Sequence, residues 1–238
     1  MGNRRVFQGS DPFAAEISAH PIREENLTQS SAQPTVYIVD DDRSMCESMC
    51  WLVETLGVPV KAFRSAASFL EAYDARIPGC LVVDVVMPAM SGLELQEQLG
   101  RSGVEIPVII VTALRDVRTA VRAMKNGAVE FLEKPFDDQV LLEQIRRALA
   151  LDVRLREERR EFDVVRKRMT RLTPREREVL ELVVNGLPNK RVASHLSMSV
   201  KTVEVHRAKI MTKMEVTNVA QLVRQVVSAK PTSVSTSL

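Results

Sequence analysis

Three short apolar runs, each followed at once by an acid or a hydroxyl, constrain this chain more than any other feature of its sequence. They cover residues 36–39, 80–83 and 108–111, are too short for helices and are rich in β-branched residues. Continuous apolar runs of this length are typical of strands buried on both faces of a parallel sheet. Strands that alternate with helices predict a doubly wound α/β domain built from right-handed βαβ units. The helices are indicated by apolar residues at helical spacing: Met45, Met49, Leu52 and Leu56, then Leu93, Leu95 and Leu99, then Val117, Val121 and Met124.

A long stretch without glycine or proline, residues 137–170, follows this region. Its apolar residues keep a helical spacing, which predicts one long helix, or two abutting helices, acting as a connector. Two interpretations stay open for the apolar stripe along it. It forms a seam between two copies of the chain, or its first half packs on the core of the first domain.

The C-terminal part carries start signals for four short helices. Thr173-Pro174-Arg175-Glu176 combines an N-cap, a proline at the first helical position and the glutamate of a capping box, and that helix ends near Gly186. Asn189, Ser199 and Asn218 are expected to cap the other three helices. These four helices predict a small all-α domain.

The same signals divide the chain into five parts. Its two ends lack apolar periodicity and are rich in small polar residues, so we expect them to be disordered. In order, the parts are a disordered extension at 1–33, the α/β domain at 34–149, a helical linker at 150–165, the all-α domain at 166–231 and a disordered tail at 232–238.

A formal net charge of +2 conceals two oppositely charged domains. Residues 34–149 carry 12 basic and 17 acidic side chains, whereas residues 166–230 carry 14 basic and 5 acidic ones. Acidic clusters suit metal ions and basic surfaces suit phosphate backbones. The two domains are therefore expected to perform different chemistry.

Export and membrane insertion are not expected. No apolar run reaches the roughly 18 to 20 residues of a membrane helix, and the N-terminus lacks a signal-peptide pattern. The cysteines Cys46, Cys50 and Cys80 are odd in number and form no Cys-x-x-Cys pair, which fits neither a disulfide framework nor a zinc site. Cys46 and Cys50 lie four residues apart on a predicted helix, so a redox switch is the alternative to simple packing. We expect a cytoplasmic protein.

Polar side chains stand at the carboxyl end of each of the three apolar runs and of a further short strand expected at Phe131-Leu132. They are Asp40, Asp41 and Asp42, then Asp84, then Thr112, then Lys134. Because the carboxyl ends of parallel strands face one crevice, these groups are expected to converge there, rather than to be unrelated helix caps and surface charges. Two acids plus waters suit Mg²⁺, while a lysine and a threonine hydroxyl suit phosphoryl oxygens. The set predicts phosphoryl transfer to a carboxylate nucleophile.

Five motifs mark this first domain: Val39-Asp40-Asp41, Val83-Asp84-Val85-Val86-Met87-Pro88, Met90-Ser91-Gly92, Val111-Thr112-Ala113 and Lys134-Pro135-Phe136. Together they resemble the receiver domain of bacterial two-component response regulators. The resemblance implies a five-stranded, flavodoxin-like sheet with Asp84 as the phosphoacceptor. It also implies that Asp40, Asp41, Asp84 and the Val86 carbonyl bind Mg²⁺, and that Thr112 and Lys134 contact the phosphoryl group. Phe131 falls on the family's aromatic switch position, although a packed core phenylalanine is an equally good interpretation.

An enzyme is the main alternative within this domain. Asp40-x-Asp42 after a first strand is also similar to the signature of haloacid dehalogenase-type phosphatases, in which Asp40 would be phosphorylated. That interpretation leaves Asp84 without a role and lacks an acidic pair downstream of Lys134. We therefore expect a regulator and not an enzyme.

Residues 200–214 predict a helix with two unlike faces. Val203, Ile210 and Met214 form an apolar stripe that faces the domain core. Val205 lies on the opposite face, where packing does not explain it, but on a helix in the major groove it can contact a thymine methyl. With the helix at 190–196 and the turn at 197–199, this favours a DNA-binding helix-turn-helix over a merely solvated basic face. The polar face carries Lys201, Ala208, Lys209 and Thr212, bordered by Thr202 and Glu204.

Three further motifs, at 172–180, 186–190 and 202–207, resemble the LuxR-type helix-turn-helix. Glu-Val-His-Arg at 204–207 and Glu-Lys-Pro-Phe at 133–136 are similar, more narrowly, to the FixJ subgroup of nitrogen-fixation and nodulation regulators. Many relatives carry lysine at the positions of Glu204 and Ala208, so their base contacts do not transfer there. For His206 we expect packing or a phosphate contact. Taken as a whole, the DNA-binding surface that we expect from the helix-turn-helix at 189–208 comprises Asn189, Lys190, Lys201, Thr202, Glu204, Val205, His206, Arg207, Ala208 and Lys209.

The sequence therefore predicts a transcription factor controlled by phosphorylation. A partner sensor histidine kinase would phosphorylate Asp84, receivers would pair as a homodimer, and two recognition helices would bind double-stranded promoter DNA at successive half-sites. The FixJ resemblance adds activation of transcription, a contact with RNA polymerase, and a role in nodulation or nitrogen fixation. The alternative is an interaction protein whose basic domain binds a partner or RNA.

Overall fold

A computed structural model describes residues 33–229 of the 238-residue chain. The disordered ends predicted at 1–33 and 232–238 lie outside the described residues, apart from Gln33. Within 33–229, no helix combines the length and the apolar character that a membrane span requires.

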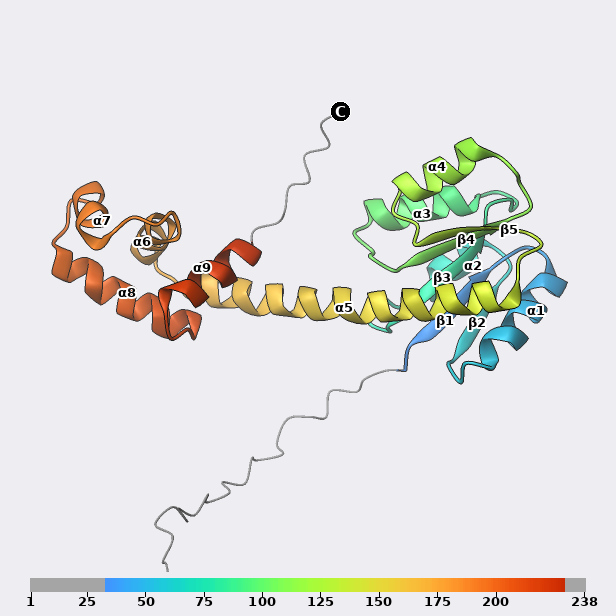
Figure 1. Cartoon of the computed structure of the whole chain (residues 1–238), viewed down its shortest axis with the longest axis horizontal. Coiled ribbons are helices and arrows are strands. Elements are labelled where there is room, and N and C mark those ends of the chain that lie inside the picture. Colours follow the sequence, from blue (N-terminus) through green and yellow to red (C-terminus); the bar gives the residue numbers. More distant parts are fainter. Residues whose placement is uncertain (1–32, 230–238) are drawn as a thin grey trace, which may run out of the picture. The chain divides into compact units, whose positions relative to one another are not determined.

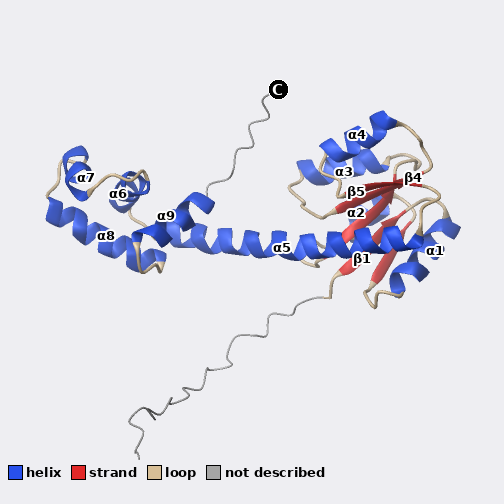
Figure 2. Cartoon of the chain, in the orientation of Figure 1, coloured by secondary structure: helices blue, strands red, loops and turns tan. Residues whose placement is uncertain are grey.

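The first domain is built on a parallel sheet with the strand order β2-β1-β3-β4-β5 (Figures 1 and 2). The order reverses between β1 and β3, which is where open α/β sheets bind ligands, outside the carboxyl ends of the strands. The strands are β1 (Thr35–Val39), β2 (Val60–Phe63), β3 (Gly79–Asp84), β4 (Val108–Thr112) and β5 (Glu130–Glu133). The helices are α1 (Arg43–Glu54), α2 (Ala66–Ala72), α3 (Gly92–Arg101), α4 (Val117–Lys125) and α5 (Asp138–Thr170). The predicted doubly wound sheet is confirmed.

Helices cover both faces of the sheet because the central strands are apolar on both. Successive residues of a strand point to opposite faces. Val36 and Ile38 pack with α1 and the start of α5, whereas Tyr37 and Val39 pack with α2 and α3. All four are completely buried. The two apolar layers hold the strands in register and so fix where their carboxyl ends lie.

Helix α4 departs from this pattern. Its apolar residues keep helical spacing, as predicted, but Val117, Val121 and Met124 are exposed, and Ala123 is the residue that the helix buries. Figure 1 shows α4 beside α3, on the side of the sheet away from α1. The predicted amphipathic helix exists, but its apolar face is turned to solvent.

Helix α5 is continuous from Asp138 to Thr170, the first of the two forms predicted for this stretch. Its first part packs in the core of the first domain through Leu141, Ile145 and Ala148. Val165, near its end, belongs to the core of the second domain. The connector therefore contributes residues to two separate cores.

The second domain contains the four predicted helices. Two of the predicted caps are confirmed, since Ser199 accepts from the Thr202 amide and Asn218 from the Gln221 amide. The prediction for Asn189 is wrong: Pro188 takes the N-cap position, so Asn189 lies inside the helix and its side chain is free for another partner. The helices are α6 (Pro174–Val184), α7 (Asn189–His195), α8 (Val200–Met214) and α9 (Val219–Ser228).

A buried ion pair joins α6 to α8. Glu176 completes the capping box with Thr173 and accepts from Lys213 Nζ at 2.6 Å. Glu176 is almost fully buried, and the hydrogen bond from Lys213 holds the pKa of its carboxyl below the ordinary value. A carboxyl with a lowered pKa stabilises the fold fully above its ordinary pKa, and this contribution is lost as the pH falls through the folded value.

Replacing Lys213 with methionine should lower the free energy of unfolding of this domain by about 2 kcal/mol at neutral pH, because Glu176 is left buried without its cation. Amide hydrogen exchange in α6 and α8 measures the change, with α1 and β3 as internal references. Lys209→Met, an exposed change on the same helix, is the control. The difference from wild type should shrink below about pH 4.5, where Glu176 becomes protonated in the unfolded chain. A difference that stayed constant with pH would rule out the ion pair as its cause.

Candidate functional site

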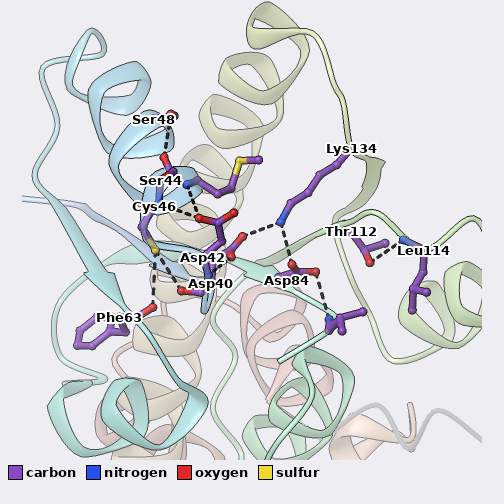
Figure 3. A network of polar contacts seen from close by, with 12 residues as sticks. Asp40, Asp42, Ser44, Cys46, Ser48, Phe63, Asp84, Thr112, Leu114 and Lys134 are labelled. Atoms are coloured by element: carbon purple, nitrogen blue, oxygen red, sulfur yellow. Dashed lines mark hydrogen bonds and ion pairs between the residues drawn. The ribbon is translucent and has the colours of Figure 1, made fainter. Parts of the chain in front are cut away.

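Four predicted residues meet at the carboxyl edge of the sheet. Asp40 follows β1, Asp84 ends β3, Thr112 ends β4 and Lys134 follows β5. Asp40 and Thr112 are completely buried and Asp84 is nearly so. Figure 3 shows the Lys134 side chain reaching between Asp40 and Asp84, with Thr112 on the other side of Asp84. The fold thus brings together groups that are up to 94 residues apart in the chain.

Lys134 is the cation of this cluster. Its Nζ lies 2.6 Å from Asp40 Oδ2 and 2.8 Å from Asp84 Oδ2. Burial alone would lower the pKa of Lys134, but the hydrogen bonds to the two carboxylates outweigh it and raise the pKa. Burial raises the pKa of Asp40, and the hydrogen bond from Lys134 opposes the rise. Lys134 therefore stays charged and binds two acids at once.

The two acids are also oriented by backbone amides. The Asp42 amide donates to Asp40 Oδ1 at 2.9 Å, and the Val86 amide donates to Asp84 Oδ1 at 3.2 Å. Each carboxylate thus has one oxygen on an amide and the other on Lys134. This arrangement fixes the direction of both side chains before any ligand arrives.

The loop after Asp84 depends on a glycine. A Cβ at Gly92 would lie 2.2 Å from the backbone oxygen of Asp84, and the Gly92 amide donates to the Val85 carbonyl at 3.1 Å. A larger residue would displace the backbone of Asp84. This close approach explains why the motif Met90-Ser91-Gly92 ends in glycine.

Three carboxylates gather tightly enough to hold a cation. One oxygen from each of Asp40, Asp41 and Asp84 lies within 4.8 Å of the others. Hard divalent cations prefer oxygen ligands, and Mg²⁺ uses few protein groups together with waters. Three acids with a single lysine leave an excess of negative charge, so the donor set fits Mg²⁺. The Val86 side chain is exposed, which does not affect its carbonyl as a further oxygen donor.

The remaining predicted residues of this domain have local roles that the structure defines. The Thr112 hydroxyl accepts from the Leu114 amide at 3.2 Å. Phe131 is half-buried against the core that α2 and α3 share with the sheet. Asp42, to which the receiver resemblance gives no role, caps α1 by accepting from the Ser44 and Met45 amides.

The cysteines are packed rather than paired. All three lie in the described part of the chain as free thiols, with Cys46 and Cys80 buried. Burial raises the pKa of Cys46 to about 11, and its sulfur donates to the Asp40 carbonyl at 3.2 Å. A thiol with a raised pKa is a poor nucleophile, so the structure favours packing over a redox switch.

Helix α8 presents the predicted two faces. Val203, Ile210 and Met214 are buried, whereas Val205 is 45% exposed. The exposed face also carries Lys201, Thr202, Glu204, Ala208 and Lys209, and Lys190 and Arg191 are exposed at the start of α7. Arg191 was not among the predicted DNA contacts, although its position beside Lys190 is a signal that could have included it.

Three predicted DNA contacts, Asn189, His206 and Arg207, are less exposed than the other seven. Arg207 is half-buried and donates to Asn189 Oδ1 at 2.8 Å, which links α8 to the first residue of α7. His206 is also half-buried, and its Nδ1 has no hydrogen-bond partner among the described residues. Their placement supports packing for both residues more than direct contact with a phosphate or base.

Comparison with known proteins assigns both halves of the chain. Residues 36–146 match the family described as response regulator receiver domain, and residues 170–226 match bacterial regulatory proteins of the luxR family. The transcriptional regulatory protein FixJ of Azorhizobium caulinodans is 45% identical over 197 residues, covering 82% of this chain and 92% of that protein. Nodulation protein W of Bradyrhizobium diazoefficiens is 40% identical over 197 residues, covering 83% and 87%. The solved structure of the response regulator StyR aligns with a TM-score of 0.70 at 44% identity, covering 82% of this chain and 99% of that one.

Proposed function

Because the chain belongs to the FixJ-like response regulators, with a receiver domain and a LuxR-type DNA-binding domain, we propose that phosphorylation of Asp84 by a partner histidine kinase controls its binding to promoter DNA. The observation that carries this proposal is the cluster of Asp40, Asp84 and Lys134 at the carboxyl edge of the sheet. It sits at the topological switch point, where such sheets bind ligands.

The residues around Asp84 suit a phosphoryl transfer. A carboxylate oxygen of Asp84 forms the bond to phosphorus while the bond to the donor nitrogen of the kinase breaks. Lys134 already contacts Asp84 and offers its charge to a phosphoryl oxygen, and Thr112 offers its hydroxyl from the end of the next strand. When bound by Asp40, Asp41, Asp84 and the Val86 carbonyl, Mg²⁺ supplies further neutralisation of the incoming charge.

Phosphorylation is proposed to promote a homodimer. The added charge is held by Thr112 and Lys134, and Phe131 is the aromatic side chain we assign to the accompanying switch. The exposed Val117, Val121 and Met124 of α4 give the receiver an apolar surface that pairing would cover. Two receivers brought together would place two α8 helices on successive major-groove half-sites.

The DNA contacts are proposed from the exposed face of α8 and the start of α7. Val205 would contact a thymine methyl, Lys201 and Lys209 phosphates or base edges, and Lys190 a phosphate. Thr202, Glu204 and Ala208 lie on the same exposed face. We assign Asn189, His206 and Arg207 to support rather than to contact.

We propose domain bounds of 34–149 and 166–231, with a linker at 150–165, which enclose the two family matches. By analogy with the relatives, we also propose a cytoplasmic location, activation of transcription in contact with RNA polymerase, and a signalling rather than an enzymatic role. The relatives named FixJ and nodulation protein W support target genes of nitrogen fixation or nodulation.

Sequence-specific DNA binding is tested by selection. The full chain, incubated with Mg²⁺ and a small acyl phosphate, is mixed with random-sequence duplexes, and the bound duplexes are recovered and sequenced. We expect two related half-sites about one helical turn apart, with affinity that falls steeply with salt. Recovery of no common sequence, or equal competition by RNA, would favour the interaction protein instead.

A second test concerns the charge balance of the pocket. Lys134→Met should lower the free energy of unfolding of the receiver by about 3 kcal/mol in EDTA, because two buried carboxylates lose their cation. Saturating Mg²⁺ should restore most of this loss, since the ion takes over the neutralisation. Hydrogen exchange of β1 and β3 measures both, with Lys125→Met on the exposed face of α4 as the control. An equal loss with and without Mg²⁺ would argue against an ion at Asp40 and Asp84.

A further inference from the structure

A buried acid lies on α5 beyond the part of the helix that packs on the sheet. Asp152 follows Ala148, the last α5 residue completely buried in the receiver core, by one helical turn. It is only 2% exposed. A buried carboxylate is costly unless its oxygens are hydrogen-bonded and its charge is paired, so its partners define what it does.

Those partners fasten α5 to the first residue of β3. Asp152 Oδ2 accepts from the Gly79 amide at 2.9 Å and from Arg156 Nε at 2.7 Å. Arg156 then donates through Nη1 to the Ala75 carbonyl and through Nη2 to the Ile77 carbonyl, both at 2.9 Å. The planar guanidinium thus binds one carboxylate and two carbonyls of the segment that leads into β3. We call Asp152 and Arg156 the α5 clasp.

The strand held by the clasp is the one that carries the phosphoacceptor. Gly79 begins β3 and Asp84 ends it. The start of the strand has little freedom, because a Cβ at Gly79 would lie 2.0 Å from the carbonyl oxygen of Thr35 in β1. A movement of Gly79 would therefore displace either the clasp or β1, because both contact this residue directly.

Beyond the clasp, α5 lacks packed side chains until it enters the second domain. Every residue from 157 to 164 is exposed, and Val165 is the next buried one. An exposed ion pair of Arg159 with Glu105 adds little to this stretch. An unpacked helical stretch this short is marginal in water by itself and depends on how its ends are held. At its receiver end, the last firm attachment is Arg156.

We propose that Asp152 and Arg156 are positioning residues that extend the receiver along α5 and carry the state of β3 into the linker helix. This inference rests on the proposed function, since it explains how phosphorylation of Asp84 reaches the DNA-binding domain. It also moves the start of the free linker from residue 150 to residue 157. A well-packed apolar pair could supply equal stability at this place, but it could not make directional bonds to three backbone groups.

The test separates coupling from folding and from phosphorylation. Arg156→Met keeps the aliphatic stem and removes all three bonds. Its matched control is Arg154→Met, since Arg154 is exposed and pairs only loosely with Glu158 at 3.7 Å. Three properties are measured on the full chain: incorporation of phosphate from an acyl phosphate, hydrogen exchange of residues 150–164, and the affinities of the phosphorylated and unphosphorylated forms for the selected duplex.

We expect Arg156→Met to incorporate phosphate to within twofold of wild type. Exchange across residues 150–164 should rise at least tenfold, and the ratio of the two DNA affinities should fall from the wild-type value to nearly one. Arg154→Met should keep the wild-type ratio. A double variant, Asp152→Asn with Arg156→Met, removes the ion pair without leaving a buried charge, and it decides the matter if the single variant fails to fold.

Each result has a distinct meaning. If wild type shows a phosphorylation-dependent ratio and the clasp variants keep it, the inference is wrong while the proposed function stands. If wild type shows no difference between its phosphorylated and unphosphorylated forms, the proposed function fails and the inference fails with it. A ratio lost in Arg154→Met as well would assign the effect to the general charge of α5 and not to the clasp.

Discussion

Wild-type protein incubated with Mg²⁺ and a small acyl phosphate should gain one phosphoryl group, and the Asp84→Asn variant should gain none. Asparagine keeps the size of the side chain and can accept from the Val86 amide as Asp84 does. It removes the nucleophilic carboxylate, so no acyl phosphate forms. The expected effect is complete loss, which intact mass measures directly.

Asp40→Asn is the matched control for this experiment. Asp40 also binds Lys134 and is also buried, but it is assigned to the metal and not to the phosphoryl group. We expect this variant to incorporate phosphate more slowly than wild type and not to lose the reaction. Incorporation that survives in Asp84→Asn and disappears in Asp40→Asn would transfer the nucleophile to Asp40 and support the phosphatase interpretation.

The second large effect is expected on the exposed face of α8. Val205→Asp should weaken binding to the selected duplex about a thousandfold, to the level of sequence-independent binding. The new carboxylate would lie in a groove lined by phosphates and would replace methyl groups that contact a thymine. A titration at fixed salt, for example by fluorescence anisotropy with the selected duplex and a scrambled one, measures the change.

Val164→Asp is the control, because Val164 is 46% exposed where Val205 is 45% exposed, and it lies on α5. The two substitutions add the same charge to side chains of equal exposure. We expect Val164→Asp to bind the selected duplex within a few-fold of wild type. Equal losses in both variants would mean that net charge, and not the α8 surface, governs the binding.

The pocket was predictable because its signals are local and repeated. Strands β1, β3 and β4 are continuous apolar runs that each lead into a polar residue, and Lys134 follows the short apolar pair in β5. Parallel topology then brings Asp40, Asp84, Thr112 and Lys134 together. The α8 face was predictable for a similar reason, since Val205 interrupts a polar face in a helix whose apolar stripe is elsewhere. In both places, the arrangement of apolar and polar residues along one segment is enough to predict where the side chains lie.

Other features lacked such a signal. Strand β2 (Val60–Phe63) lies at the edge of the sheet, contains Lys61 and is only partly buried, so it forms no apolar run. The bond of Arg207 to Asn189 joins residues 18 apart, and α7 and α8 must be folded before it can form. The α5 clasp looks in the sequence like an ordinary exposed i,i+4 pair, and only its contacts near Gly79 distinguish it.

Helix α4 is the opposite case, because its apolar pattern is clear in the sequence but its apolar side chains do not pack in the core. Helical spacing of Val117, Val121 and Met124 predicted a helix, and the helix is present, but these three apolar side chains are exposed. An apolar stripe on a helix indicates a surface that packs against something, but it does not tell whether the partner is the domain's own core or another molecule. The proposed receiver pairing gives this surface a partner.

The most direct test of phosphorylation control is the ratio of the DNA affinities of the phosphorylated and unphosphorylated protein. The affinity of the full chain for the selected duplex is measured before and after treatment with acyl phosphate and Mg²⁺, for wild type and Asp84→Asn side by side. We predict that treatment tightens binding by at least tenfold in wild type and leaves Asp84→Asn unchanged. Equal affinities of treated and untreated wild type, with phosphate incorporation verified by mass, would contradict the account.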